Sequence, residues 1–107
     1  MPWLTADDPR IPSLWAGSAD LTPELLALIL EASRDECAEY APKLADPDLP
    51  PPRYVLAQAE HARNIARALD QQADQIGNYG DAVTLPTVPL DWHVKQRLRP
   101  KTRPVVG

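Results

Sequence analysis

The sequence is short of the residues on which several protein classes depend. Its 107 residues include one cysteine, four glycines and no phenylalanine. A single cysteine excludes a disulfide within the chain and the zinc frameworks that are built from several cysteines. The longest apolar run, LLALIL, is far shorter than the roughly 20 residues that a membrane-spanning helix needs. The first residues show no signal-peptide pattern. We therefore expect one small soluble domain with no membrane partner.

Acidic side chains are missing from the C-terminal segment. Residues 1–94 hold all fifteen Asp and Glu residues against six Lys and Arg, which gives a formal charge of −9, whereas residues 95–107 hold five Lys and Arg and no acid, which gives +5. Basic tails often bind nucleic acid, but an anionic body repels a phosphate backbone. An acidic protein partner is at least as reasonable for this tail.

The 13 prolines divide the chain into segments. Prolines and turn residues predict an extended N-terminal arm over residues 1–21. Thr22 as N-cap and Pro23 at the first helical position predict a helix to about Tyr40. A second helix is expected from the Pro50–Pro52 run to about Gln75 or Ile76.

Beyond the second helix, residues 82–90 predict a short β-hairpin or an extended loop, because their prolines disfavour a central strand. Asp91 is a suitable N-cap for a short helix from Trp92 to about Leu98, which Pro100 ends. The fold class is therefore mainly α: a small helical bundle of two long helices and a short C-terminal one, with extended termini. It divides into an arm (1–21), a helical body (22–90) and a short helix with a basic docking tail (91–107).

The apolar residues of the two long helices predict which faces are buried. In the first helix, Leu25, Leu28, Ile29 and Ala32 recur at helical spacing, and Leu26 and Leu30 broaden that face. In the second helix a 4-3 spacing defines a seam of mostly small residues: Val55, Ala59, Ala62, Ala66, Leu69, Ala73 and Ile76. Leu56 and Ile65 lie to one side of the seam, and Gln58 is expected to be exposed.

The sequence offers no convincing catalytic or metal-binding constellation. His61 is expected to be solvated, since Arg63 and Arg67 nearby disfavour a bound cation. Cys37 lies close to several carboxylates that raise the pKa of a thiol, so we expect a buried structural cysteine rather than a nucleophile. No nucleotide-binding, hydrolase or metalloprotease motif is present. We expect no enzymatic activity, no cofactor and no metal.

The remaining candidates are recognition residues. Trp3, Trp15 and Trp92 lie outside the two long helices, and tryptophan and arginine are enriched in interface hot spots. Two interpretations of the N-terminal tryptophans stay open: they pack on the chain's own core, or they dock on a neighbouring subunit. The candidate subunit-interface residues are Trp3, Trp15, Ala59, Ala62 and Ala66.

The C-terminal half carries a family resemblance. The segments YVLAQAEHARNIARAL, DQIGNYGDAVTL and PLDWHVKQRLRPKTRP resemble small head–tail connector (adaptor) proteins of actinobacterial tailed phages, over about residues 22–104. The most specific element is DW.VK..LRP, formed here by Asp91, Trp92, Val94, Lys95, Leu98, Arg99 and Pro100. The chain departs from the family pattern at residues 88–90, where Val-Pro-Leu replaces a segment that carries an aromatic residue.

The resemblance implies a structural protein of the virion, made in the host cytoplasm and located at the head–tail junction. Such adaptors form a ring, commonly of twelve copies, beneath the portal protein. The ring extends the channel through which genomic DNA passes without specific binding, and it offers a docking surface to a downstream tail or stopper protein. In related siphophage connectors the C-terminal segment reaches into the portal.

On this basis Trp92 is expected to anchor the tail against the adaptor's own body. The candidate portal-docking residues are Trp92, Lys95, Arg97, Arg99, Lys101 and Arg103. The alternative is a small DNA-binding or regulatory protein whose basic C-terminal tail contacts phosphates. Binding of duplex DNA at low salt discriminates between the two functions.

Overall fold

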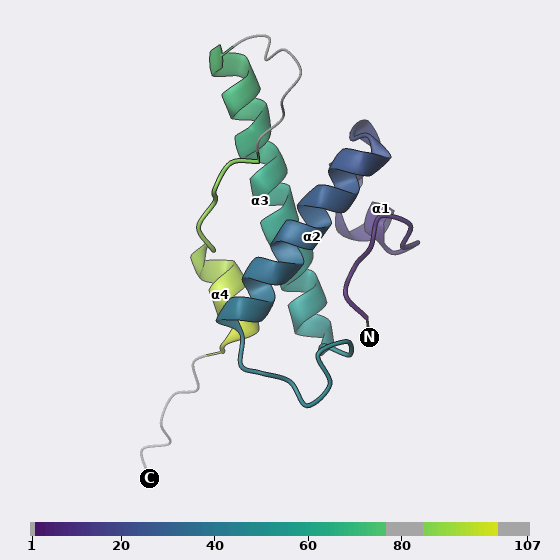
Figure 1. Cartoon of the computed structure of the whole chain (residues 1–107), viewed down its shortest axis with the longest axis vertical. Helices are drawn as coiled ribbons and strands as arrows, with labels where there is room; N and C mark the ends of the chain where they lie inside the picture. The colour runs from purple at the N-terminus through teal and green to yellow at the C-terminus, as the bar shows by residue number, and fades with distance from the viewer. Residues whose placement is uncertain (1, 77–84, 101–107) are drawn as a thin grey trace.

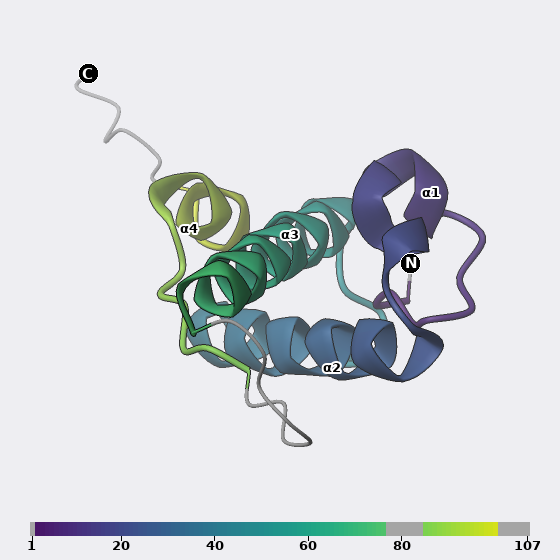
Figure 2. The same ribbon diagram turned by 90° about the horizontal axis from the view of Figure 1, so that it is seen from above.

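The computed structural model describes residues 2–76 and 85–100, with only the backbone of residues 72–76. Over these residues the fold is mainly helical, as predicted, and it contains no strand. The elements in chain order are α1 (Ile11–Leu14), the 3-10 helix η1 (Ala16–Asp20), α2 (Pro23–Tyr40), α3 (Pro52–Ile76) and α4 (Trp92–Leu98). α3 is central, because both α2 and α4 pack against it (Figures 1 and 2).

Helix α2 begins and ends where the sequence predicted. The side-chain oxygen of Thr22 accepts a hydrogen bond from the backbone N–H of Leu25, and Pro23 occupies the first turn. At the other end Ala41 adopts an extended conformation. Pro42 follows, and a proline disfavours helical backbone in the residue before it. Local chemistry alone therefore fixes both ends of this helix.

The buried face of α2 is the predicted one except at Leu28, since Leu25 and Ala32 also pack against the main core. Leu28 is 47% exposed, whereas Leu26, Ile29 and Leu30 are buried. The buried stripe continues through Ser33 and Cys37, both fully buried. The polar Ser33 Oγ–H donates to the carbonyl oxygen of Leu30, so it enters the core without an unpaired donor. Burial of Cys37 was expected, whereas burial of the polar Ser33 was not.

Helix α3 has the predicted length, and its seam is partly confirmed. Val55, Ala59 and Ala62 are buried in the main core. Beyond Ala62 the buried position is Ile65, while Ala66 is only partly buried. The side chains of the last two seam positions, 73 and 76, lie outside the described residues.

The N-terminal arm belongs to the main core and is more regular than predicted. It contains α1 and η1, and its Leu4, Ile11 and Trp15 join the main core beside α2 and α3. Trp3 joins a second cluster, where its ring lies 6.1 Å from that of Tyr54. Trp3 and Trp15 are 6% and 7% exposed. Of the two interpretations of these tryptophans, the structure shows packing on the chain's own core.

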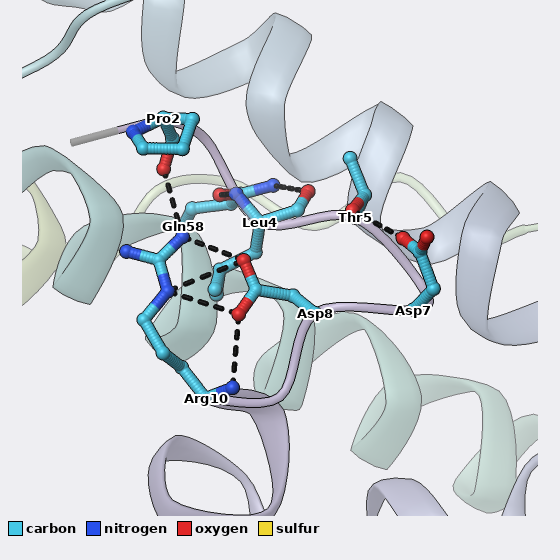
Figure 3. A network of polar contacts seen from close by, with 7 residues as sticks. All are labelled: Pro2, Leu4, Thr5, Asp7, Asp8, Arg10 and Gln58. Atoms are coloured by element: carbon cyan, nitrogen blue, oxygen red, sulfur yellow. Dashed lines mark hydrogen bonds and ion pairs between the residues drawn. The ribbon is translucent and has the colours of Figure 1, made fainter.

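Gln58 on α3 holds the arm in place. The prediction that this residue is exposed is wrong: its side chain is fully buried. Its Oε1 accepts from the backbone N–H of Leu4 at 2.7 Å, and its Nε2 donates to the carbonyl oxygens of Leu4 at 3.0 Å and Leu30 at 3.1 Å. Figure 3 shows the amide against the arm. Gln58 thus satisfies the buried N–H and C=O of Leu4, which lie outside any helix, and adds a third bond to the carbonyl of Leu30 in α2.

A second group of contacts closes the arm upon itself. Arg10 pairs with Asp8 at 2.6 Å and donates to the carbonyl oxygen of Pro2 at 3.0 Å (Figure 3). The hydrogen bond from Arg10 lowers the pKa of the Asp8 carboxyl group. Arg10 therefore joins the beginning of the arm to the start of α1.

The predicted hairpin lies partly outside the described residues, since residues 82–84 are not described. Residues 85–90 form no regular element. Leu85 and Val88 pack against the main core, and Leu90 packs against the second cluster. This connection therefore runs along the body before α4 begins.

We predict that Gln58→Leu destabilises the fold strongly. The leucine has a similar volume, but it leaves the buried N–H and C=O of Leu4 without their partner, whereas the C=O of Leu30 keeps the hydroxyl of Ser33. An unpaired buried group costs about 1–3 kcal/mol, so a loss above about 2 kcal/mol is expected in urea unfolding. Gln71→Leu, at an exposed position of the same helix, is the matched control. Equal unfolding midpoints for the two variants would contradict the role of Gln58.

A second prediction concerns the close packing at Ala62, which is fully buried. Ala62→Leu adds three carbon atoms to a filled site and is expected to cost about 1–3 kcal/mol. Ala38→Leu, at an exposed position of α2, should leave thermal unfolding nearly unchanged. An unaltered midpoint for Ala62→Leu would show that the site has spare room.

Candidate protein-docking site

Helix α4 begins at a complete N-cap, as predicted. Asp91 has an extended backbone, and its Oδ1 accepts from the backbone N–H of Val94 at 2.8 Å. Its other oxygen, Oδ2, accepts from the side-chain amide of Asn64 on α3 at 2.9 Å. One carboxylate therefore both starts α4 and ties its first turn to the central helix.

The inner face of α4 supplies its apolar anchorage. Val94 and Leu98, one turn apart, are both fully buried in the second cluster. They pack there with Cys37 of α2 and with Tyr54 and Ala57 of α3. An isolated helix of seven residues is unstable in water. Burial of this face is therefore what keeps α4 helical.

Two arginines fix the C-terminal end of α4. Arg97 donates through Nε and Nη2 to the two carboxylate oxygens of Glu60 on α3, at 3.2 and 3.3 Å. The Nε–H of Arg99 donates to the carbonyl oxygen of Tyr40, in the last turn of α2. Carbonyls at a helix end lack partners within the helix, so Arg99 satisfies one of them. α4 is thereby joined to both long helices.

The structure assigns the predicted docking residues to different surroundings. Trp92 is 66% exposed, so the expectation that it anchors α4 on the body is wrong. Its ring lies nearly perpendicular to that of His93, with centroids 5.1 Å apart. Lys95 is exposed, whereas Arg97 and Arg99 are engaged with the body. Lys101 and Arg103 lie outside the described residues.

Three residues that hold this site together escaped the sequence analysis. Tyr40 has Lys95 Nζ at 5.8 Å and Arg99 Cζ at 5.3 Å from its ring centroid, within the range of cation–π contacts. Glu60 and Asn64 are the α3 partners of α4. Their spacing of four residues was the available signal, because it places both on one side of a helix.

His61 lies inside the molecule, which contradicts the predicted solvated position. Its ring is fully buried, and its Nε2 lies 2.8 Å from Oε2 of Glu36 on α2. Because a carboxylate only accepts, Nε2 is the nitrogen that donates here. Nδ1 is buried and finds no hydrogen-bond partner among the described residues. His61 therefore couples α3 to α2 rather than facing water.

Cys37 is a buried structural residue, as predicted. Burial raises the pKa of its thiol to about 12, and the charge of Glu36 adds to this effect. The predicted direction is correct, but desolvation contributes more than the neighbouring carboxylates. The thiol is therefore protonated and unreactive at neutral pH.

No described helix is long and apolar enough to cross a membrane. Among the described residues, no three His, Cys, Asp or Glu side chains gather as a metal site would require. Comparisons with models of known protein families, with curated proteins and with solved structures found no match to this chain.

We predict that the Asp91 cap weakens in acid. The N–H of Val94 and the amide of Asn64 hold the pKa of Asp91 below its usual value, against the opposing effect of burial. A carboxyl group with a lowered folded-state pKa stabilises fully above its unfolded value, about 3.9, and loses this contribution as the pH falls through the folded pKa.

Replacement by alanine tests this prediction. At pH 7 Asp91→Ala is expected to cost about 0.5–2 kcal/mol, as N-cap losses do. The difference from the parent protein should shrink as thermal unfolding is repeated at decreasing pH below about 4. Asp20→Ala, at an exposed position of η1, is the control. A difference that stays constant with pH would contradict an ionised cap.

Proposed function

We propose that this chain is a structural, non-enzymatic subunit of a phage head–tail adaptor. In this proposal, copies of the chain form a ring beneath a portal protein, extend the DNA channel and present a surface to a tail or stopper protein. The supporting observation is the structural role of the DW.VK..LRP element in the folded chain. Asp91 caps α4, Val94 and Leu98 are buried, and Arg99 binds the end of α2. Four of the residues that carry the resemblance thus act together to fix one short helix on the body.

A fixed α4 determines where the basic tail leaves the body. Pro100 follows α4 directly and restricts the backbone there. A tail that starts from a rigid base loses less conformational entropy on docking than one that starts from a flexible linker. This arrangement supports the tail as a docking peg for an acidic surface on the portal protein.

The contacts of α4 change which basic residues are available for this docking. Arg97 and Arg99 already bind Glu60 and the backbone of Tyr40. We therefore assign the specific portal contacts first to Lys101 and Arg103 in the tail. The guanidinium of Arg103 can bind a carboxylate with two hydrogen bonds, whereas Lys101 supplies a point charge.

The charge distribution supports passage of DNA rather than binding of DNA. Residues 1–94 have a formal charge of −9, from six Lys and Arg against fifteen Asp and Glu. A channel built from such a body repels phosphates, so DNA moves through it without adhering. In this proposal the protein resides in the virion, at the junction of head and tail.

We predict that the full-length chain co-purifies with portal rings and forms a collar on them in electron micrographs. The double variant Lys101→Glu/Arg103→Glu is expected to lose at least about tenfold in portal affinity, because like charges across an interface cost several kcal/mol. Its helical circular-dichroism signal should stay unchanged. Lys43→Glu, at an exposed position between α2 and α3, serves as the charge-matched control.

Two outcomes would overturn this proposal. A well-folded chain that never joins portal rings excludes the adaptor function. A double variant that joins them normally excludes the peg. Fluorescence anisotropy with duplex DNA at low salt tests the alternative: tight, tail-dependent DNA binding without portal binding would favour a DNA-binding protein.

A further inference from the structure

Within the described part of the chain, one face of helix α4 is exposed. Trp92, Lys95 and Arg99 follow each other at intervals of three and four residues, so they point to the same side. Trp92 is 66% exposed. Tyr40 of α2 extends this surface, since the cations of Lys95 and Arg99 both lie over its ring. We refer to Tyr40, Trp92, Lys95 and Arg99 as the cationic strip.

The composition of the cationic strip is that of an interface. Tryptophan, tyrosine and arginine are the side chains most enriched in binding hot spots. Within the described part of the chain, no carboxylate forms an ion pair with Lys95 or Arg99. Arg97, by contrast, is paired with Glu60. No described carboxylate therefore neutralises the positive charge of the strip, although the Nε–H of Arg99 already binds the carbonyl oxygen of Tyr40.

Helix α2 presents a complementary face. At intervals of four, three, four and four residues it exposes Glu24, Leu28, Glu31, Asp35 and Glu39. Leu28, the second residue of this row, is 47% exposed. We refer to these five residues as the acidic strip. α2 and α4 pack around α3 (Figure 2), and no ion pair joins the two strips within the described residues.

We propose that the cationic strip docks on the acidic strip of a second copy of this chain. The two surfaces match in charge, and each carries an exposed apolar residue, Trp92 on one and Leu28 on the other. The contact joins unlike surfaces, so it repeats from copy to copy and generates a ring where the rotation closes. The inference rests on the proposed ring function and names the interface that builds the ring.

Charge reversal with rescue by mixing tests this proposal in the full chain. Sedimentation velocity at low salt is expected to show self-association of the parent protein that weakens as salt is added. Lys95→Glu and Asp35→Lys each place like charges opposite one another, so each variant alone should associate at least about tenfold more weakly. An equal mixture should recover association, because every contact between the two variants again joins opposite charges.

Matched controls and a second measurement separate this interface from general charge effects. Lys43→Glu and Asp20→Lys change exposed residues outside both strips and should associate as the parent does. Trp92 is the exposed tryptophan, whereas Trp3 and Trp15 are buried. Acrylamide quenching should therefore decrease as the parent protein is concentrated, and it should stay constant for Lys95→Glu.

The proposal is wrong if the parent remains a monomer at every concentration, if either reversal leaves association unchanged, or if the mixture does not recover it. It is also wrong if Lys95→Glu abolishes binding to duplex DNA instead of self-association. The outcomes distinguish a failure of this interface from a failure of the adaptor function. If Lys95→Glu forms normal collars on portal rings, the interface is contradicted and the adaptor function stands. If self-association is rescued by mixing but the chain does not bind portal rings, the interface stands and the adaptor function is contradicted.

Discussion

The side-chain amide of Gln58 is the contact on which the packing of the N-terminal arm depends. The arm at Leu4 has no regular secondary structure, yet its backbone is buried and its N–H and C=O need partners. Gln58 provides both and also binds the carbonyl of Leu30, so one side chain connects the arm, α3 and α2. With the backbone satisfied, Trp3 and Trp15 can bury their rings, and a small chain gains the core area that its many alanines do not supply.

Helix α3 fixes the C-terminal helix by the same means. α4 is too short to be stable alone, and α3 offers it Glu60 for Arg97 and Asn64 for the capping Asp91. Polar side chains at intervals along α3 thus hold the flanking segments in position, while its small apolar residues allow close approach. Such directional contacts specify one arrangement where an alanine surface permits several.

Sequence alone predicted those features that local chemistry determines. Thr22 and Asp91 cap their helices as expected, because an N-cap interacts with backbone only three residues away. Gln58 and His61 were expected in solvent, since their partners Leu4 and Glu36 lie far off in the sequence. The prediction for Trp92 was wrong in the opposite sense, because burial was expected and the ring is exposed. Hydrophobicity predicts burial only where the fold supplies a surface that covers the side chain. Contacts between residues that lie far apart in the chain cannot be read from a single sequence.

The surface centred on α4 exists only in the folded chain. Its tyrosine comes from α2 and its tryptophan and cations from the α4 segment, and the bond from Arg99 to the carbonyl of Tyr40 brings them together. A partner that recognises this composite surface binds the docked form of α4 and not the detached one. Binding therefore stabilises the docked form by mass action, and loss of the Asp91 cap weakens partner binding without any contact at Asp91 itself. In the proposed interface, the folding of α4 onto the body and the recognition of the partner are therefore thermodynamically coupled.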